Sequence, residues 1–274
     1  MRYLLVFAFS FFTSSVFAQY WFGPKIGFSY IDHIFQESTY ESDSFNIPKN
    51  WNFQAGLAVS YSATDRYAVY GELLYEKIGK KITDLATDGE NVSTEMTNHF
   101  LSVPVMLRIT LGRVPFHYYI NGGPRISFWL GGKGKISLEE FDESTPAGID
   151  ENENALPVEY TITFKESALL EADNFDPAYI SNPNRLQFGL TAGGGLFFDI
   201  QGGGRLQFDF RYTWVHSNMG TNDSDDFLAF DSYRENFEYY HGIATLGVAY
   251  MFDYNSQLKR KGKSTARESN KKKK

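Results

Sequence analysis

Residues 205–214 read RLQFDFRYTW, and the odd and even positions of this stretch differ in polarity. Every second side chain from Leu206 to Trp214 is aliphatic or aromatic, whereas the side chains between them are polar or charged. In an extended strand, successive side chains point to opposite faces, so residues two apart share a face. The stretch therefore predicts a β-strand with one apolar face and one polar face.

The same alternation recurs along the chain and predicts eight strands. In residues 51–61 and 101–110, for example, large apolar side chains alternate with small or polar ones. The predicted strands are residues 20–31, 50–61, 66–78, 99–111, 116–130, 185–200, 205–217 and 237–252. Beyond the N-terminal segment, no apolar run reaches the roughly 18 residues that a membrane-spanning helix needs. The sequence therefore excludes a helical membrane protein.

The connections between these strands alternate between short and long. The short ones are residues 62–65, 112–115 and 201–204, and the long polar ones are residues 32–49, 79–98, 131–184 and 218–236. Up-and-down barrels of the outer membrane have short periplasmic turns and long external loops. The alternation predicts this architecture and places both termini on the periplasmic side.

Lysine content distinguishes this barrel from a soluble, lipocalin-like one, which is apolar inside and polar outside. The eight predicted strands contain only two lysines, Lys25 and Lys77. A strand surface that faces water normally carries more lysine and glutamate. We therefore expect the apolar face to meet lipid, in an all-β, antiparallel transmembrane barrel.

Eight strands enclose a lumen that side chains can fill, so we expect a packed interior without a pore. Strand parity points seven charged side chains inward, and their mixed signs suit a buried network of ion pairs and hydrogen bonds. A proton or ion path is the alternative interpretation. The predicted lumen residues are Glu72, Glu76, Arg108, Arg125, Arg185, Asp209 and Arg211.

The two ends of the chain differ from the barrel segment, residues 19–253. Residues 1–18 combine Arg2, an apolar stretch and a small-residue cleavage site, which predicts a removed signal peptide. Residues 254–274 form a basic tail: from Asp253 onward, nine basic residues face two acidic ones, a net charge of +7. We expect this tail to be disordered in the periplasm. There is no cysteine, which excludes disulfides, thiolate metal sites and a lipid anchor.

The long external loop, residues 131–184, is strongly acidic. Twelve acidic residues face three lysines, a net charge of −9. Such a loop could bind divalent cations that bridge lipopolysaccharide, or simply stay solvated. Residues 135–138 and 158–164 could form an extra hairpin that extends the barrel above the membrane, with ten strands as the alternative, and residues 166–172 could form a short helix.

Motifs on five of the predicted strands are similar to those of the PorT-like family of outer-membrane β-barrels. They are Gly27–Tyr30, Phe53–Leu57, Gly71–Tyr75 with Gly79, Phe100–Arg108 and Asn121–Arg125. The chain resembles this family over nearly its whole mature length, except for the acidic loop and the basic tail. The resemblance implies an integral outer-membrane barrel, and the namesake branch of the family acts in type IX protein secretion.

The last predicted strand also resembles a family-level signature. Thr245, Gly247, Tyr250 and Phe252 match the polar-x-Gly-x-x-hydrophobic-x-aromatic pattern that the barrel-assembly machinery reads in its clients. An ordinary amphipathic strand is the alternative interpretation. The signature usually ends a protein, whereas here the basic tail follows it.

No residues form a convincing enzyme, metal or cofactor site. His216 and Ser217 are adjacent and therefore point to opposite faces, unlike the same-face pair that a lipid A deacylase needs. The other histidines form no ligand spacing. Residues 150–154 begin like a calcium loop, but the turn glycine and the final glutamate are absent, and residues 223–226 are a weaker candidate.

We therefore expect a non-enzymatic structural or accessory barrel of the outer membrane, without a cofactor and with a role in type IX secretion implied by the resemblance. The expected partners are outer-membrane lipid, the barrel-assembly machinery, and envelope or secretion proteins that contact the loops or the tail, with no nucleic acid. A ligand-binding or transport barrel and a lipid A-modifying enzyme are the alternatives.

Overall fold

The structure is a computed structural model. It describes residues 19–35, 45–46, 50–84, 92–113, 116–138, 159–164, 177–180, 182–200, 204–220 and 239–254. Several predictions concern residues outside these ranges: the signal peptide, nearly all of the basic tail, the calcium-like segments at 150–154 and 223–226, and the helix at 166–172. Among the described residues, no helix is long and apolar enough to cross a membrane.

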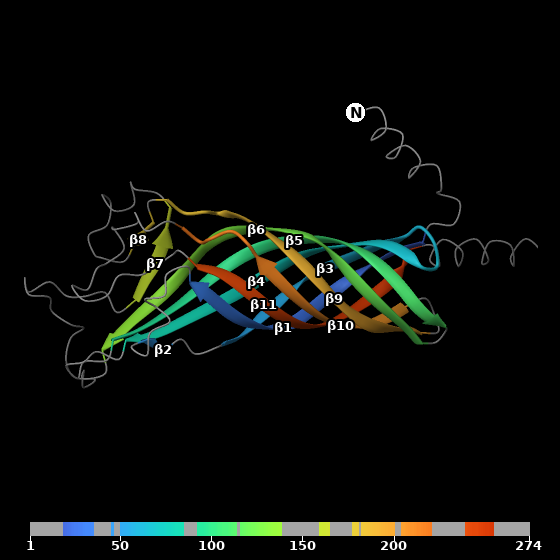
Figure 1. The fold of residues 1–274 in the computed structure, drawn as a ribbon, viewed down its shortest axis with the longest axis horizontal. Coiled ribbons are helices and arrows are strands. Elements are labelled where there is room, and N and C mark those ends of the chain that lie inside the picture. The colour runs from blue at the N-terminus through green and yellow to red at the C-terminus, as the bar shows by residue number, and fades with distance from the viewer. Residues whose placement is uncertain are drawn as a thin grey trace, which may run out of the picture.

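Eight long strands form a closed antiparallel barrel, as the sequence predicts (Figure 1). They are β1 (Gln19–Phe35), β3 (Asn50–Ser62), β4 (Tyr67–Asp84), β5 (Val92–Arg113), β6 (Phe116–Leu138), β9 (Leu186–Ile200), β10 (Gly204–Val215) and β11 (Tyr239–Asp253). Three short strands are added to this barrel: β2 (Phe45–Asn46), β7 (Glu159–Thr163) and β8 (Pro177–Tyr179).

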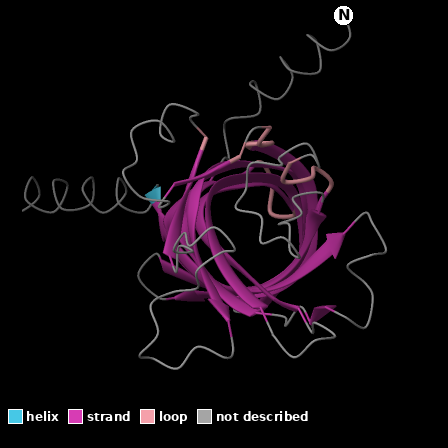
Figure 2. Ribbon diagram, turned by 90° about the vertical axis from the view of Figure 1, so that its left-hand side faces the viewer, coloured by secondary structure: helices cyan, strands magenta, loops and turns pink. Residues whose placement is uncertain are grey.

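The first and last strands close the barrel. β1 pairs with β11 from Trp21, opposite Asp253, to Phe35, opposite Tyr239. Because the remaining long strands pair in sequence order, this ladder leaves no long strand at an open edge, where unpaired backbone groups would be costly in lipid. Figure 2, which views the barrel along its axis, shows the complete ring.

The two ends of the barrel differ. The first residues of β1, the last residues of β11 and the three tight connections lie at one end, which we call the turn end. The other end, the loop end, carries the longer connections together with β2, β7 and β8, at the left of Figure 1. One tight connection is shaped by Gly112, whose φ of +95° is a conformation that favours glycine.

Strands β4, β5 and β6 continue beyond the predicted lengths at the loop end. β4 reaches Asp84 and β5 begins at Val92, so only residues 85–91 connect them, instead of the predicted 79–98. β6 reaches Leu138, and its residues 132–135 pair antiparallel with β7. An extra strand therefore pairs here, but of the predicted residues 135–138 only Lys135 takes part. β7 does not enter the ring, because β6 pairs with β9 from Phe116 to Phe128. The barrel therefore has eight strands rather than the alternative ten.

The outer and inner faces have the polarity that the sequence predicts. Large apolar side chains point outward on every long strand, as illustrated by Phe28, Leu107 and Phe210, which are 58%, 67% and 56% exposed. Charged side chains such as Lys25 and Glu72 point inward and are buried. This distribution is the reverse of that in a water-soluble barrel, and it forms an apolar belt for lipid contact.

Candidate functional site

Four charged side chains meet in the middle of the lumen: Lys25 from β1, Glu72 from β4, and Asp209 and Arg211 from β10. Lys25 Nζ lies 2.8 Å from Glu72 Oε1 and 2.7 Å from Asp209 Oδ2. Arg211 Nη1 lies 2.8 Å from Glu72 Oε2, and Arg211 Nε lies 3.0 Å from Asp209 Oδ1. Each cation therefore contacts both anions. We call this arrangement the central charge cluster.

The central charge cluster has no net formal charge and almost no exposed surface. All four residues are at most 4% exposed. Burial of a charge in a low-dielectric interior is costly unless the charge is paired and hydrogen-bonded. Glycine makes room for the cluster, because a Cβ at Gly247 would lie 2.8 Å from Lys25 Cε, and one at Gly193 would lie 2.7 Å from Arg211 Cγ. The sequence thus provides both the charges and the space for them.

A second buried group joins Glu76 of β4 to Arg125 of β6 through two serines. The Arg125 guanidinium donates to Glu76 and to Ser102 Oγ, and Arg125 Nε donates to Ser127 Oγ at 3.0 Å. Ser102 also donates to Glu76, so the carboxylate has two neighbouring donors. This group is also neutral and bridges three consecutive strands of the barrel.

Arg108 of β5 fills the lumen by stacking rather than by ion pairing. Its guanidinium carbon lies 3.8 Å from the ring centre of Tyr70 and 4.0 Å from that of Tyr119. Arg108 Nη1 donates to Gln207 Oε1 at 3.0 Å, and Gln207 Nε2 donates to the Tyr70 hydroxyl at 3.1 Å. Stacking between two aromatic rings stabilises a guanidinium, and the three side chains, each at most 2% exposed, occupy this part of the lumen.

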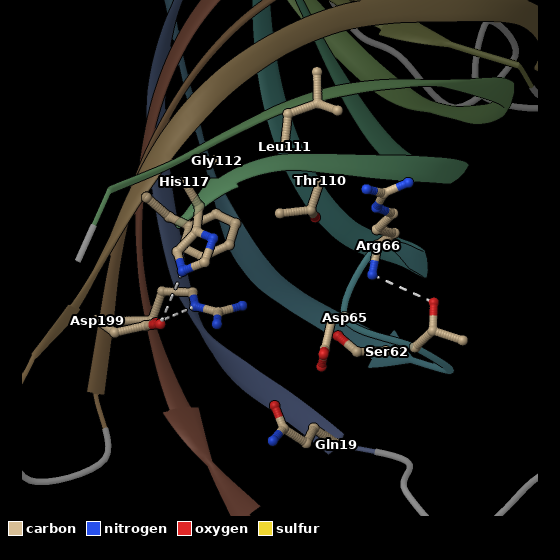
Figure 3. A pocket seen from close by; sticks show the side chains of 12 residues that line it. Gln19, Ser62, Asp65, Arg66, Thr110, Leu111, Gly112, His117 and Asp199 are labelled. Atoms are coloured by element: carbon tan, nitrogen blue, oxygen red, sulfur yellow. Dashed lines mark hydrogen bonds and ion pairs between the residues drawn. The ribbon is translucent and has the colours of Figure 1, made fainter. Parts of the chain in front are cut away.

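A cavity of about 680 Å³ opens at the turn end (Figure 3). Arg205 closes its inner side: the guanidinium lies 4.1 Å from the Trp21 ring centre and 3.8 Å from that of Phe197, and Nε donates to Asp199 Oδ1 at 2.7 Å. His117 Nε2 lies 3.6 Å from Asp199 Oδ2. No residue of the central charge cluster lines this cavity, which is bounded by residues of the turn end.

Aromatic and aliphatic side chains fill the loop end. Trp129 is fully buried, packs against Phe100 and Phe164, and donates through Nε1 to Asn98 Oδ1 and to the Gly131 carbonyl, both at 3.1 Å. The apolar cluster around it includes residues of β7, so the extra strand contributes to the closure. The interior that looks open between the ribbons of Figure 2 is filled by side chains.

The structure places six of the seven predicted lumen residues inside the barrel. Arg185 is the exception. It lies just before β9, where the strand alternation does not fix its direction, and it is half-buried, with its guanidinium 4.6 Å from the ring centre of Phe128 and 4.5 Å from that of Phe164. Lys25 and Arg205 belong to the lumen groups but were not predicted. Strand parity places Lys25 opposite the outward residues of β1 and could have identified it.

The proposed assembly signature lies on β11 with its residues on both faces. Thr245 and Gly247 face the lumen, and Thr245 Oγ1 lies 3.1 Å from Ser29 Oγ. Tyr250 and Phe252 face outward at the turn end and are 37% and 38% exposed. Recognition by the assembly machinery stays a prediction.

The catalytic and metal-binding alternatives gain no support from the described residues. Ser217 Oγ accepts a hydrogen bond from the Phe188 backbone N–H, whereas the His216 ring packs against Trp214. Within the described ranges, no three histidine, aspartate or glutamate side chains come together as a metal site.

Comparison with solved structures gives several distant matches. The outer membrane protein OprG from Pseudomonas aeruginosa is 10% identical, with 86% of this chain and 96% of that chain covered and a TM-score of 0.42. Neisserial surface protein A is 8% identical, with 87% and 99% covered and a TM-score of 0.39. The outer membrane protease OmpT from Escherichia coli is 8% identical, with 86% and 96% covered and a TM-score of 0.40.

Comparison with sequences and sequence families gives one assignment. No curated protein matches the sequence. A family model described as "Outer membrane protein beta-barrel domain" matches residues 17–215, which is well over half of the 274-residue chain. The matched segment contains seven of the eight long strands and all of the central charge cluster. The chain belongs to the outer membrane protein beta-barrel domain family.

Proposed function

We propose that this integral outer-membrane barrel is a non-enzymatic structural or accessory component of the cell envelope. The filled lumen carries the proposal. Five groups of side chains occupy the lumen in succession from the turn end: Arg205, Arg108, the central charge cluster, the Glu76–Arg125 group and the Trp129 cluster. Their charged groups are paired or stacked. A transport barrel would need a continuous hydrated path, and an enzyme would need an accessible reactive group.

The interaction surfaces of such a component lie outside the membrane. We place the turn end in the periplasm, because outer-membrane barrels have short turns and their termini on that side. The ends of β6 and β9 that the acidic segment joins then lie on the extracellular side, and the end of β11 that the basic segment follows lies on the periplasmic side. These segments of opposite charge are the surfaces that we assign to envelope partners.

Type IX protein secretion is the process in which we place this component. The resemblance to the PorT-like family supports the assignment through the motifs on β5 and β6, which include Arg108 and Arg125. Both arginines take part in filling the lumen, so these motif positions have a structural role in this barrel.

Two measurements test the proposal. The purified full chain in planar bilayers should produce no sustained conductance steps, and steady single-channel openings would refute the filled-lumen scaffold. Deletion of the gene in the source bacterium should reduce the surface delivery of secreted cargo, and restoration should require the barrel. Normal cargo delivery in the deletion strain would refute the secretion role while leaving the scaffold role open to other envelope partners.

A further inference from the structure

A basic groove of about 580 Å³ lies on the outside of the barrel at the loop end. Residues of β4, β5, β6 and β7 form it: most of their side chains point outward, whereas Gly134 and Tyr160 are buried beneath the groove, and β6 and β7 provide much of one wall. The residues that line this basic groove are Lys77, Glu95, Thr97, His99, Lys133, Gly134, Lys135, Glu159, Tyr160 and Thr161.

The basic groove begins directly where the apolar belt ends. Tyr75, Leu101 and Phe128 are register neighbours that form an outward apolar row across β4, β5 and β6, and Leu130, which is 46% exposed, extends the apolar belt on β6. The next outward row begins with Lys77 paired with His99. Two residues along a strand correspond to about 7 Å, so the charged row lies at the depth where lipid headgroups follow the hydrocarbon region.

Beyond the row of Lys77 and His99, two further rows of side chains continue the basic groove away from the apolar belt. Thr97, Lys133 and Thr161 are register neighbours across β5, β6 and β7. Beyond them, Lys81 forms an ion pair with Glu95 at 2.6 Å. This pair accounts for one of the two carboxylates that line the groove, and the other, Glu159, is the register partner of Lys135.

The lysines closest to the belt have no such partner. Lys77 and Lys133 are exposed, and neither forms an ion pair with any residue that the structure describes. His99 Nδ1 lies 2.6 Å from the Tyr75 hydroxyl, which holds its ring against the edge of the apolar belt. Two ammonium groups that have no ion-pair partner among the described residues therefore lie just beyond the apolar belt.

We propose that the basic groove binds the phosphate group of an anionic membrane lipid. Lysine side chains can lay their aliphatic stems along apolar surface and extend the ammonium group to the headgroup region. The acyl chains of the same lipid would then lie on Tyr75, Leu101 and Phe128. This continuity with the apolar belt favours a membrane lipid over free phosphate, and the inference does not depend on the proposed function.

The experiment is native mass spectrometry of the detergent-solubilised full chain, titrated with lipid A diphosphate, phosphatidylglycerol or phosphatidylcholine. Anionic lipid should remain bound to the wild type more than phosphatidylcholine. The double variant Lys77→Gln/Lys133→Gln should bind the anionic lipids roughly 25-fold more weakly, because each membrane-proximal lysine contributes separately. Phosphatidylcholine binding should not change.

Two further variants separate the charge effect from folding. Lys77→Arg/Lys133→Arg keeps both positive charges and should retain anionic lipid, whereas Arg66→Gln removes an exposed cation at the turn end and should change nothing. Heat-modifiability electrophoresis verifies that each variant is folded. Equal lipid retention by the wild type and the double glutamine variant would overturn the proposal. Displacement of the lipid by equimolar inorganic phosphate would identify a free-phosphate site and would also overturn it.

Discussion

Removal of Lys25 should destabilise the barrel strongly, because it leaves the central charge cluster with two anions and one cation. In the substitution Lys25→Met, a side chain of similar length loses the ammonium group that lies 2.8 Å from Glu72 and 2.7 Å from Asp209. Loss of one partner from a buried ion pair typically costs about 3–5 kcal/mol, since an unpaired charge stays buried. We expect a decrease of this size in the free energy of unfolding.

A second substitution tests whether charge balance is the cause. The double variant Lys25→Met/Asp209→Asn removes one charge of each sign and keeps the Arg211–Glu72 pair at 2.8 Å. If the cost of Lys25→Met comes from an unbalanced charge, the double variant should be more stable than the single variant by about 2 kcal/mol, although it carries more changes.

The assay is equilibrium urea unfolding of the barrel in lipid vesicles, followed by tryptophan fluorescence and by heat-modifiability electrophoresis. Lys81→Met is the matched control, because it also removes a lysine from an ion pair, but this pair is 39% and 57% exposed. Its cost should be at most about 1 kcal/mol. Two results would refute this reasoning. Lys25→Met could lower the free energy of unfolding no more than the control, or the double variant could lose the sum of what Lys25→Met and Asp209→Asn each lose alone. Either result would mean that the central charges are hydrated rather than mutually paired.

Three further substitutions test other parts of the structure by the same unfolding measurement. Gly247→Ala should cost about 1–3 kcal/mol, because the new Cβ would lie 2.8 Å from Lys25 Cε; an unchanged stability would mean that the lumen is looser than described. Trp129→Ala should cost about 3–5 kcal/mol by opening a cavity at the loop end, and a cost below about 1 kcal/mol would indicate that this end is hydrated. Leu107→Arg should cost about 2–4 kcal/mol, because Leu107 is 67% exposed within the apolar belt, and a neutral effect would contradict its contact with lipid.

Strand parity predicts most of the fold and much of the lumen because the barrel repeats one local rule. Once one face meets lipid, the direction of Glu72 or Asp209 follows from its distance along the strand to an outward aromatic residue. The rule fails where a strand ends, which explains Arg185. It also cannot give the partners of a side chain, since the Lys25–Asp209 contact depends on register across the barrel closure.

The sequence predicts less well how far the strands extend and where the basic groove lies. The sequence from Gly79 to Asn98 contains polar residues on both faces, so the alternation that marks the belt disappears although the backbone ladder continues. Two of the residues that line the basic groove, Glu95 and Thr97, lie in this region. The residues of the groove come from four strands, and only the register brings Lys77 and Lys133 to one surface.

Gly247 connects the assembly signature with the interior of the barrel. The signature requires a glycine at this position, and the central charge cluster independently requires one, because any Cβ there would also lie 3.0 Å from Asp209 Oδ1. The pattern at Thr245 and Gly247 therefore has a sufficient explanation in lumen packing. Tyr250 and Phe252 point outward, so their side chains are not constrained by the lumen groups. These two aromatic residues are consequently the part of the signature that can act in recognition without contributing to the lumen.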